Sequence, residues 1–109
     1  MKSCLFCKIA NKQISSRLEY EDEKIFAFDD INPKAPVHIL LVPKVHINSL
    51  NEIKEKDKDL LGHLIYQAKI LAQKKDIADK GYRIIINCGK YAGQEVDHLH
   101  VHLLGGKPL

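Results

Sequence analysis

The stretch His98-Leu99-His100-Val101-His102-Leu103-Leu104 places three imidazoles at every second position, with apolar residues between them. In a strand successive side chains point to opposite faces, so the histidines should share one face and the apolar residues the other. Same-face neighbours lie about 7 Å apart, a spacing that suits cooperation on one substrate or metal ion. A merely polar face is the alternative, and three histidines in register disfavour it. The spacing does not choose between a metal site and a phosphate site built on a nucleophilic imidazole.

The rest of the chain predicts an α+β domain around this strand. Apolar, β-branched runs bounded by turn residues predict further strands, and apolar residues at helical spacing predict one long helix. Together they describe a five-stranded, largely antiparallel sheet with one long and one short helix. The expected elements are a short helix or turn at 4–10, strands at 18–20, 25–28, 37–42, 82–88 and 98–104, loops at 29–36 and 89–95, and a helix capped by Asp57 that ends near Lys75.

Length, composition and charge restrict the class of protein. A chain of 109 residues, 45% hydrophobic and 28% charged, is long enough for one domain and too short for two, so residues 1–109 should form a single domain. The 17 Lys+Arg and 14 Asp+Glu residues are interleaved, which gives no support to nucleic-acid binding. No apolar run resembles a signal peptide or a membrane span, so we expect a cytoplasmic protein without a membrane partner.

The cysteines indicate a second site near the N-terminus. Cys4 and Cys7 have Cys-x-x-Cys spacing, and the total of three cysteines is odd. In a reducing compartment this favours a metal or free thiols over disulfides. Two thiolates need two further nitrogen or sulfur ligands to complete a tetrahedral zinc site. The alternative is a pair of free or buried thiols, and Cys88 is expected to be a packed thiol.

Two features favour phosphate at the histidine face. The segment 87–94 places an amide side chain and a glycine-containing loop just before the histidines, where free backbone N–H groups can hold an anion. His38 stands at the start of an apolar strand, where an imidazole needs a partner. Taken alone, His38 is better explained as a hydrogen-bonded core histidine than as a functional residue.

The histidine stretch matches, without a departure, the His-φ-His-φ-His-φ-φ signature of the histidine triad (HIT) nucleotide hydrolases and transferases. Other motifs resemble the Hint branch of that family, which acts on nucleoside phosphoramidates, and they cover nearly the whole chain. They are Cys7-Lys8-Ile9, Ala27-Phe28, Asp30-Ile31, Ala35-Pro36, His38, Val42-Pro43-Lys44, His46-Ile47, Leu60-Leu61-Gly62-His63-Leu64, Gly81-Tyr82-Arg83, Asn87, Gly93-Gln94 and Gly105-Gly106.

The resemblance implies an activity. It predicts cleavage of purine nucleoside 5′-phosphoramidates or related adenylates at the α-phosphate, through a nucleotidyl-histidine intermediate. His100 would be the nucleophile, His102 would contact the phosphoryl oxygens, and His38 would belong to the supporting hydrogen-bond network. No metal is implied at the nucleotide site.

The resemblance also implies how the ligand, a purine nucleotide such as AMP or adenosine phosphoramidate, would be bound. Asp30 would hydrogen-bond the ribose hydroxyls, and Ile31 would pack near the base. The residues implied around the phosphate, besides His100 and His102, are Asn87, Gly93, Gln94 and Glu95.

Glu95 is a departure, because the Hint pattern often has serine there. A carboxylate adds negative charge beside a phosphate, which puts the leaving-group preference and the rate in question. The alternative function is therefore a zinc-stabilised nucleotide- or protein-binding module with little turnover.

Some bacterial relatives resemble this chain in pairing Cys-x-x-Cys with two histidines. The resemblance implies that Cys4, Cys7, His46 and His98 bind Zn²⁺, and four protein ligands make such a site structural. His98 would then be held by the metal and would not relay protons to His100.

A homodimer is also expected. Tyr66 and Ile70 lie away from the main apolar stripe of the long helix, so a second, partly apolar face is available to another subunit. The alternative is that both are ordinary exposed residues.

Overall fold

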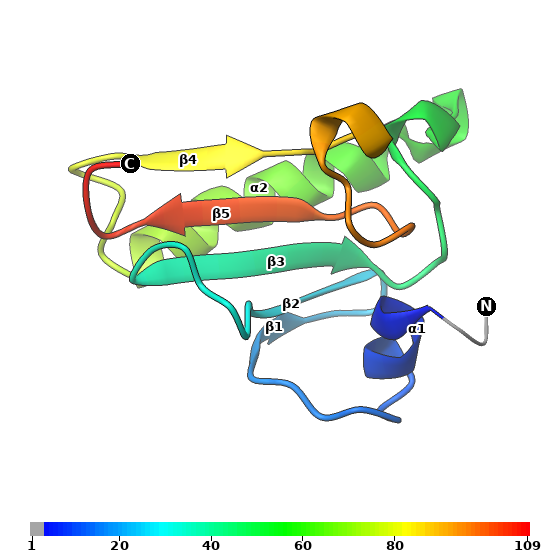
Figure 1. Cartoon of the computed structure of the whole chain (residues 1–109), viewed down its shortest axis with the longest axis horizontal. Coiled ribbons are helices and arrows are strands. Elements are labelled where there is room, and N and C mark those ends of the chain that lie inside the picture. The colour runs from blue at the N-terminus through cyan, green and yellow to red at the C-terminus, as the bar shows by residue number, and fades with distance from the viewer. Residues whose placement is uncertain (1–3) are drawn as a thin grey trace.

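A five-stranded sheet runs through the molecule with a helix on each face, as the computed structural model of residues 4–109 shows (Figure 1). The strand order is β1-β2-β3-β5-β4, and every neighbouring pair is antiparallel, which confirms the predicted fold class. The helices and strands are α1 (Leu5–Ala10), β1 (Leu18–Glu21), β2 (Ile25–Asp29), β3 (Val37–Pro43), α2 (Lys58–Lys74), β4 (Tyr82–Ile85) and β5 (Val101–Gly105).

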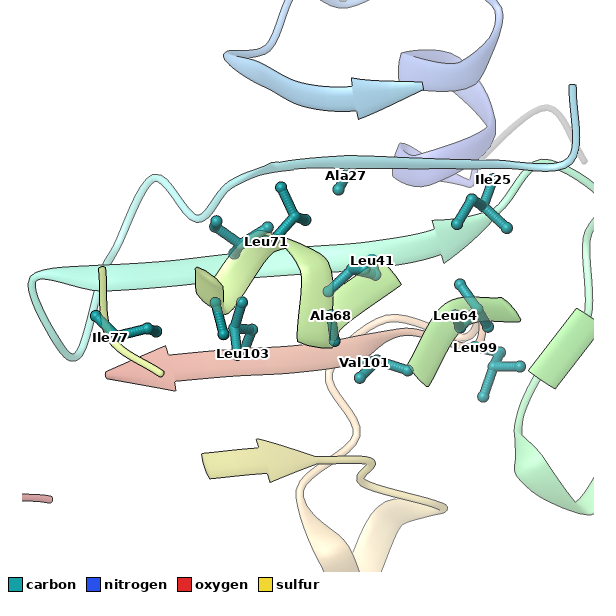
Figure 2. Close-up of a cluster of buried hydrophobic side chains, with 12 residues drawn as sticks. Ile25, Ala27, Leu41, Leu64, Ala68, Leu71, Ile77, Leu99, Val101 and Leu103 are labelled. Carbon is teal, nitrogen blue, oxygen red and sulfur yellow. The ribbon is translucent and has the colours of Figure 1, made fainter. Parts of the chain in front are cut away.

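The two faces of the sheet bury different helices. Ile25 and Ala27 of β2 pack in the core under α2, whereas Phe26 and Phe28 pack with α1 on the opposite face. This is the alternation expected of a strand that is buried on both sides. The core under α2 contains Leu64, Ala68, Leu71, Leu99, Val101 and Leu103, among others (Figure 2).

The strand predicted at 98–104 is wrong in its first three residues, because β5 begins at Val101. Val101 pairs with Leu41, so Pro43 would stand opposite Leu99 if the pairing continued. Proline has no N–H to donate to a ladder, and the Leu99 N–H bonds instead to the Ile47 carbonyl at 2.6 Å. The alternation nevertheless persists, because Leu99 and Val101 both lie in the α2 core.

Two other expected boundaries change. β4 ends at Ile85, three residues before the predicted end at Cys88, because Ile85 pairs with His102 and β5 begins only one residue earlier. Asp57 does not cap α2 through its side chain; its carboxylate accepts the Lys54 backbone N–H at 3.1 Å and closes a 3-10 turn. The end of α2, at Lys74 with Lys75 as its cap, agrees with the prediction.

The helices of residues 4–109 include none that combines the length and the apolar character needed to cross a membrane.

Two glycines should respond oppositely to alanine. Gly106 has a φ of +95°, and a Cβ there would lie 2.9 Å from Pro36 Cβ, so Gly106→Ala should lower the free energy of unfolding by about 1–3 kcal/mol. Gly62 lies inside α2 with open space around it, so Gly62→Ala should raise that free energy by about 0.5–1 kcal/mol. Urea denaturation measures both values. Equal effects of the two substitutions would contradict the different surroundings described for Gly106 and Gly62.

Candidate functional site

The imidazoles gather on the face of the sheet opposite α2. The ring centroids of His100 and His102 lie 5.0 Å apart, and His38 Nε2 of β3 lies 3.0 Å from His102 Nδ1. Phe6 of α1 packs edge-on against His98 and His100, with centroid distances of 5.7 and 5.1 Å. The structure therefore brings together all three histidines of the run and the predicted His38.

A backbone carbonyl fixes the tautomer of His100. Its Nδ1 lies 2.7 Å from the His98 carbonyl oxygen, which can only accept a hydrogen bond. Nδ1 therefore carries the proton, and Nε2 of the neutral ring keeps its lone pair. His100 is 6% exposed and stands beside His102, so this lone pair is held in one orientation in a largely dry site. Such a nitrogen can act as a nucleophile.

A chain of hydrogen bonds likewise fixes His38 and His102. The Lys34 backbone N–H donates to His38 Nδ1 at 3.1 Å, so neutral His38 carries its proton on Nε2. That proton faces His102 Nδ1, which accepts it and leaves the His102 proton on Nε2. Burial lowers the pKa of His38 and lowers the pKa of His102 to about 4, which keeps both rings neutral at pH 7. His102 can therefore donate a hydrogen bond from Nε2.

Asp30 joins this network, and its carboxylate lies 3.4 Å from His38 Nε2. Asp30, His38 and His102 could each offer one ligand atom to a metal ion, since these atoms lie within 4.8 Å of one another. A metal there would displace the Nε2 proton of His38 and force the proton onto Nδ1, against the Lys34 N–H. The geometry favours a proton-linked network over a metal site.

A cavity of about 950 Å³ lies beside the network. Its walls include Leu5 and Ile9 of α1, Phe28 of β2, and both Asp30 and Ile31. Ile31 is 88% exposed and forms part of the rim. The lining is mixed, because Arg17, Glu19, Asp29 and Lys75 also border the cavity. Its apolar walls suit a planar ring, and the Asp30 carboxylate suits a joined group that carries hydroxyl donors.

The predicted phosphate residues Asn87, Gly93, Gln94 and Glu95 are not among the residues that line this cavity. Asn87 is half-buried beyond the end of β4, and exposed Gly93 follows a 3-10 turn at Lys90–Ala92. The Gln94 side chain is used within the protein, since it accepts from the Gly89 N–H and donates to two carbonyls, so only its backbone is left for a ligand. Glu95 is exposed and lines a separate hollow of about 430 Å³ together with Cys4 and His46.

The four residues predicted to bind zinc converge at the start of α1. Their ligand atoms lie within 4.8 Å of one another. Cys4 Sγ lies 3.2 Å from His98 Nδ1, and Cys7 Sγ lies 3.2 Å from His46 Nδ1 and 3.6 Å from His98 Nδ1. Zn–S and Zn–N bonds in a tetrahedron put neighbouring ligand atoms about 3.3–3.8 Å apart. The Cys₂His₂ donor set therefore fits zinc in number, chemistry and spacing.

Both histidines of this cluster direct an unprotonated nitrogen, Nδ1, towards the cysteine sulfurs. His98 Nε2 lies 2.8 Å from the Pro43 carbonyl, and His46 Nε2 lies 2.6 Å from Asn48 Oδ1. Each Nε2 therefore carries the proton, and each Nδ1 directs its lone pair at the sulfurs, as in protein zinc sites whose imidazoles are oriented by oxygen acceptors. Burial and the neighbouring Cys4 thiol raise the pKa of Cys7, a cost that a bound cation offsets.

Sequence reasoning missed three contacts that orient these rings. They come from the Phe6 ring, the Lys34 N–H and the Pro43 carbonyl. The apolar spacing of Phe6 and Ile9 within the predicted short helix was a signal that one face of this helix is buried. The two backbone contacts have no signal in residue type.

The neutral state of His102 predicts how stability depends on pH. Its folded pKa of about 4 lies below the value of about 6.5 for an unfolded histidine, so the unfolded state binds more protons between these values. The contribution of His102 to the free energy of unfolding should therefore be fully present above about pH 6.5. It should fall as the pH drops towards 4, by up to about 1.4 kcal/mol per pH unit for this proton.

Urea denaturation of chelator-treated protein between pH 4.5 and 7 measures this slope. His102→Gln removes one titrating group, so the variant should show a shallower dependence than the wild type. Parallel curves would contradict a neutral His102 in the folded state.

Comparisons with known proteins show which sequences and folds this chain is similar to. The family model described as "Scavenger mRNA decapping enzyme C-term binding" matches residues 3–107. The purine nucleoside phosphoramidase of Escherichia coli K12 is 43% identical over 105 residues, which span 96% of this chain and 88% of that protein. The 14 kDa zinc-binding protein of Zea mays is 48% identical over 107 residues, 96% of this chain and 83% of that protein. A HIT family hydrolase structure from Legionella pneumophila Philadelphia 1 has a TM-score of 0.95 at 45% identity, and covers 97% of this chain and 95% of that one.

Proposed function

The chain belongs to the histidine triad family, and from this premise we propose that residues 1–109, as one domain, form a hydrolase of purine nucleoside 5′-phosphoramidates or related adenylates. The observation that carries the proposal is the orientation of His100. Its Nδ1 proton is held by the His98 carbonyl at 2.7 Å, so Nε2 is the free, nucleophilic nitrogen.

In the proposed reaction His100 Nε2 attacks the α-phosphorus, and the P–N bond to the amine breaks as the new N–P bond forms. The amine departs with a proton taken up from solvent. Water then attacks the nucleotidyl-histidine, the P–N bond to His100 breaks, and the proton lost by the water returns to solvent as the nucleoside monophosphate and neutral His100 are released. His102, with its Nε2 proton directed away from His38, donates to a phosphoryl oxygen and stabilises the charge that develops there. His38 holds His102 in the donor tautomer.

The cavity beside His38 would take the nucleoside. We propose that the base lies against the apolar walls near Ile31 and Phe28, and that Asp30 accepts hydrogen bonds from the ribose hydroxyls. Asn87 and the backbone of Gly93–Glu95 would contact the phosphate. A purine is favoured because the similar protein of Escherichia coli K12 is named a purine nucleoside phosphoramidase.

Zinc would have a structural role. Cys4, Cys7, His46 and His98 supply four protein ligands and leave no open position, which is the pattern of a structural site. When bound, the metal supplies a positive charge that keeps both thiols deprotonated, and it links α1 to the segment that precedes β5. His98 would then serve the metal and support His100 through its carbonyl.

We also propose that the protein is a homodimer. Tyr66 on α2 is 56% exposed and Ile70 is half-buried, on a face that does not enter the core. Light scattering at micromolar concentration should give twice the chain mass of 12.4 kDa, and a monomer mass would remove the proposal.

Release of AMP from adenosine phosphoramidate, followed by chromatography, tests the enzymatic proposal. Multiple turnovers per protein are expected. AMP binding without release would instead support a binding module with little turnover, and absence of both would exclude a nucleotide site.

A further inference from the structure

The segment His46–Asn48 contacts both the cysteine cluster and the chain on either side of His98. His46 belongs to the cluster through Nδ1, and its Nε2 lies 2.6 Å from Asn48 Oδ1. The Ile47 carbonyl accepts the N–H of Leu99, between His98 and His100, at 2.6 Å. Figure 1 shows that this part of the chain, the loop before β5 and α1 gather at the end of the sheet where β3 ends.

Asn48 extends the contact into the glycine loop. Its backbone carbonyl accepts from Gln94 Nε2 at 2.7 Å, and the same Nε2 donates to the Val96 carbonyl at 3.0 Å. Gln94 Oε1 accepts from the Gly89 N–H at 2.8 Å. The Gln94 side chain therefore joins both ends of the 89–96 loop to Asn48.

The loop depends on these bonds because its own sequence is permissive. Gly89 and Gly93 have φ values of +89° and +81°, a region that glycine enters freely in the unfolded and the folded chain alike. Ordering such a loop costs conformational entropy, and a ligand that needs the ordered loop bears this cost on binding. Contacts that order the loop beforehand make the ligand bind more tightly.

We propose that Asn48 is a positioning residue that links occupancy of the cysteine cluster to nucleotide binding. The inference rests on the proposed nucleotide and zinc sites and adds their regulation by each other. A His46 ring held at Nδ1 keeps Nε2 on Asn48, and an ordered Asn48 holds Gln94 and hence the loop. Because binding linkage is reciprocal, zinc should tighten AMP binding and AMP should tighten zinc binding by the same factor.

Calorimetric titration of AMP into zinc-loaded and chelator-stripped protein measures the factor. We expect the loaded protein to bind AMP about tenfold more tightly, within the range typical of coupled sites. Competition with a chromophoric zinc chelator, with and without saturating AMP, should give an equal factor for zinc.

Variants locate the link. Asn48→Ala removes the acceptor for His46, and Gln94→Ala removes the bonds to the loop, so each should bring the factor close to one. The double variant should be no worse than either, because each change breaks the same chain of contacts. Asn48→Asp keeps an acceptor oxygen and should restore the factor. Asn51→Ala, an exposed asparagine three residues away, is the matched control and should retain it.

The outcomes separate this inference from the proposed function. Wild-type protein that binds both AMP and zinc with a factor of one overturns the link and leaves both sites intact, as does a factor retained in Gln94→Ala. Wild-type protein that binds no AMP refutes the proposed nucleotide site, and wild-type protein that binds no zinc refutes the proposed zinc site; either result also removes the link. The Gln94 side chain hydrogen-bonds to Gly89, Asn48 and Val96, and to none of the four cluster residues. Its variant therefore decides the question even where Asn48→Ala loses zinc or, by circular dichroism, its fold.

Discussion

Replacing His100 by alanine should lower the rate of AMP release from adenosine phosphoramidate by at least about a thousandfold. Neither His102 nor His98 can replace it as the nucleophile, because both ring nitrogens of each are already engaged or protonated. His102 Nδ1 accepts from His38, which leaves a proton and no lone pair on His102 Nε2. His98 directs Nε2 at the Pro43 carbonyl and Nδ1 at the two thiols. Without His100 the covalent route is lost, and only direct attack by water remains.

A histidine outside the site provides the matched control. His63 of α2 pairs with Asp22 at 2.6 Å, and α2 covers the face of the sheet opposite the imidazoles, so His63→Ala should retain turnover. AMP binding to His100→Ala, measured by calorimetry, should persist because the cavity walls are unchanged. Turnover of His100→Ala equal to that of His63→Ala would contradict a nucleophilic His100.

The fold could be predicted from the sequence because burial alternates with a clear period. The two faces of β2 and the apolar face of α2 both follow from that pattern. The first residue of β5, Val101, could not be predicted in the same way. It depends on which residue stands opposite Leu99, and Pro43 is brought there only by the β3–β5 register.

The candidate site could likewise be predicted only in part. Residue type and spacing predicted that imidazoles share a face, whereas their protonation depends on backbone groups that no side-chain pattern reveals. The Lys34 N–H and the His98 carbonyl set the tautomers of His38 and His100. His46 was identified as a zinc residue only through the family resemblance, since 39 residues separate it from Cys7. Asn48 had no signal, because it acts through a carbonyl and one side-chain oxygen.

Cys4→Ser should abolish zinc binding and lower the melting temperature. The Cys4 side chain also caps α1, where it accepts the Cys7 N–H at 3.4 Å. Serine is among the best N-cap residues, so the substitution keeps the cap and removes only the thiolate. A hydroxyl is not deprotonated near neutral pH and does not replace a zinc thiolate. The variant therefore isolates the contribution of the metal.

The expected size follows from linkage. A ligand present at a thousand times its dissociation constant stabilises the folded state by about 4 kcal/mol, which corresponds to about 15–30 °C for a domain of this size. Cys88→Ser, which alters a half-buried thiol outside the cluster, should keep one zinc per chain and most of the melting temperature. Chelator should destabilise the wild type and Cys88→Ser but leave Cys4→Ser unchanged, because that variant has no metal to lose. One zinc per chain in both variants would contradict Cys4 as a zinc ligand.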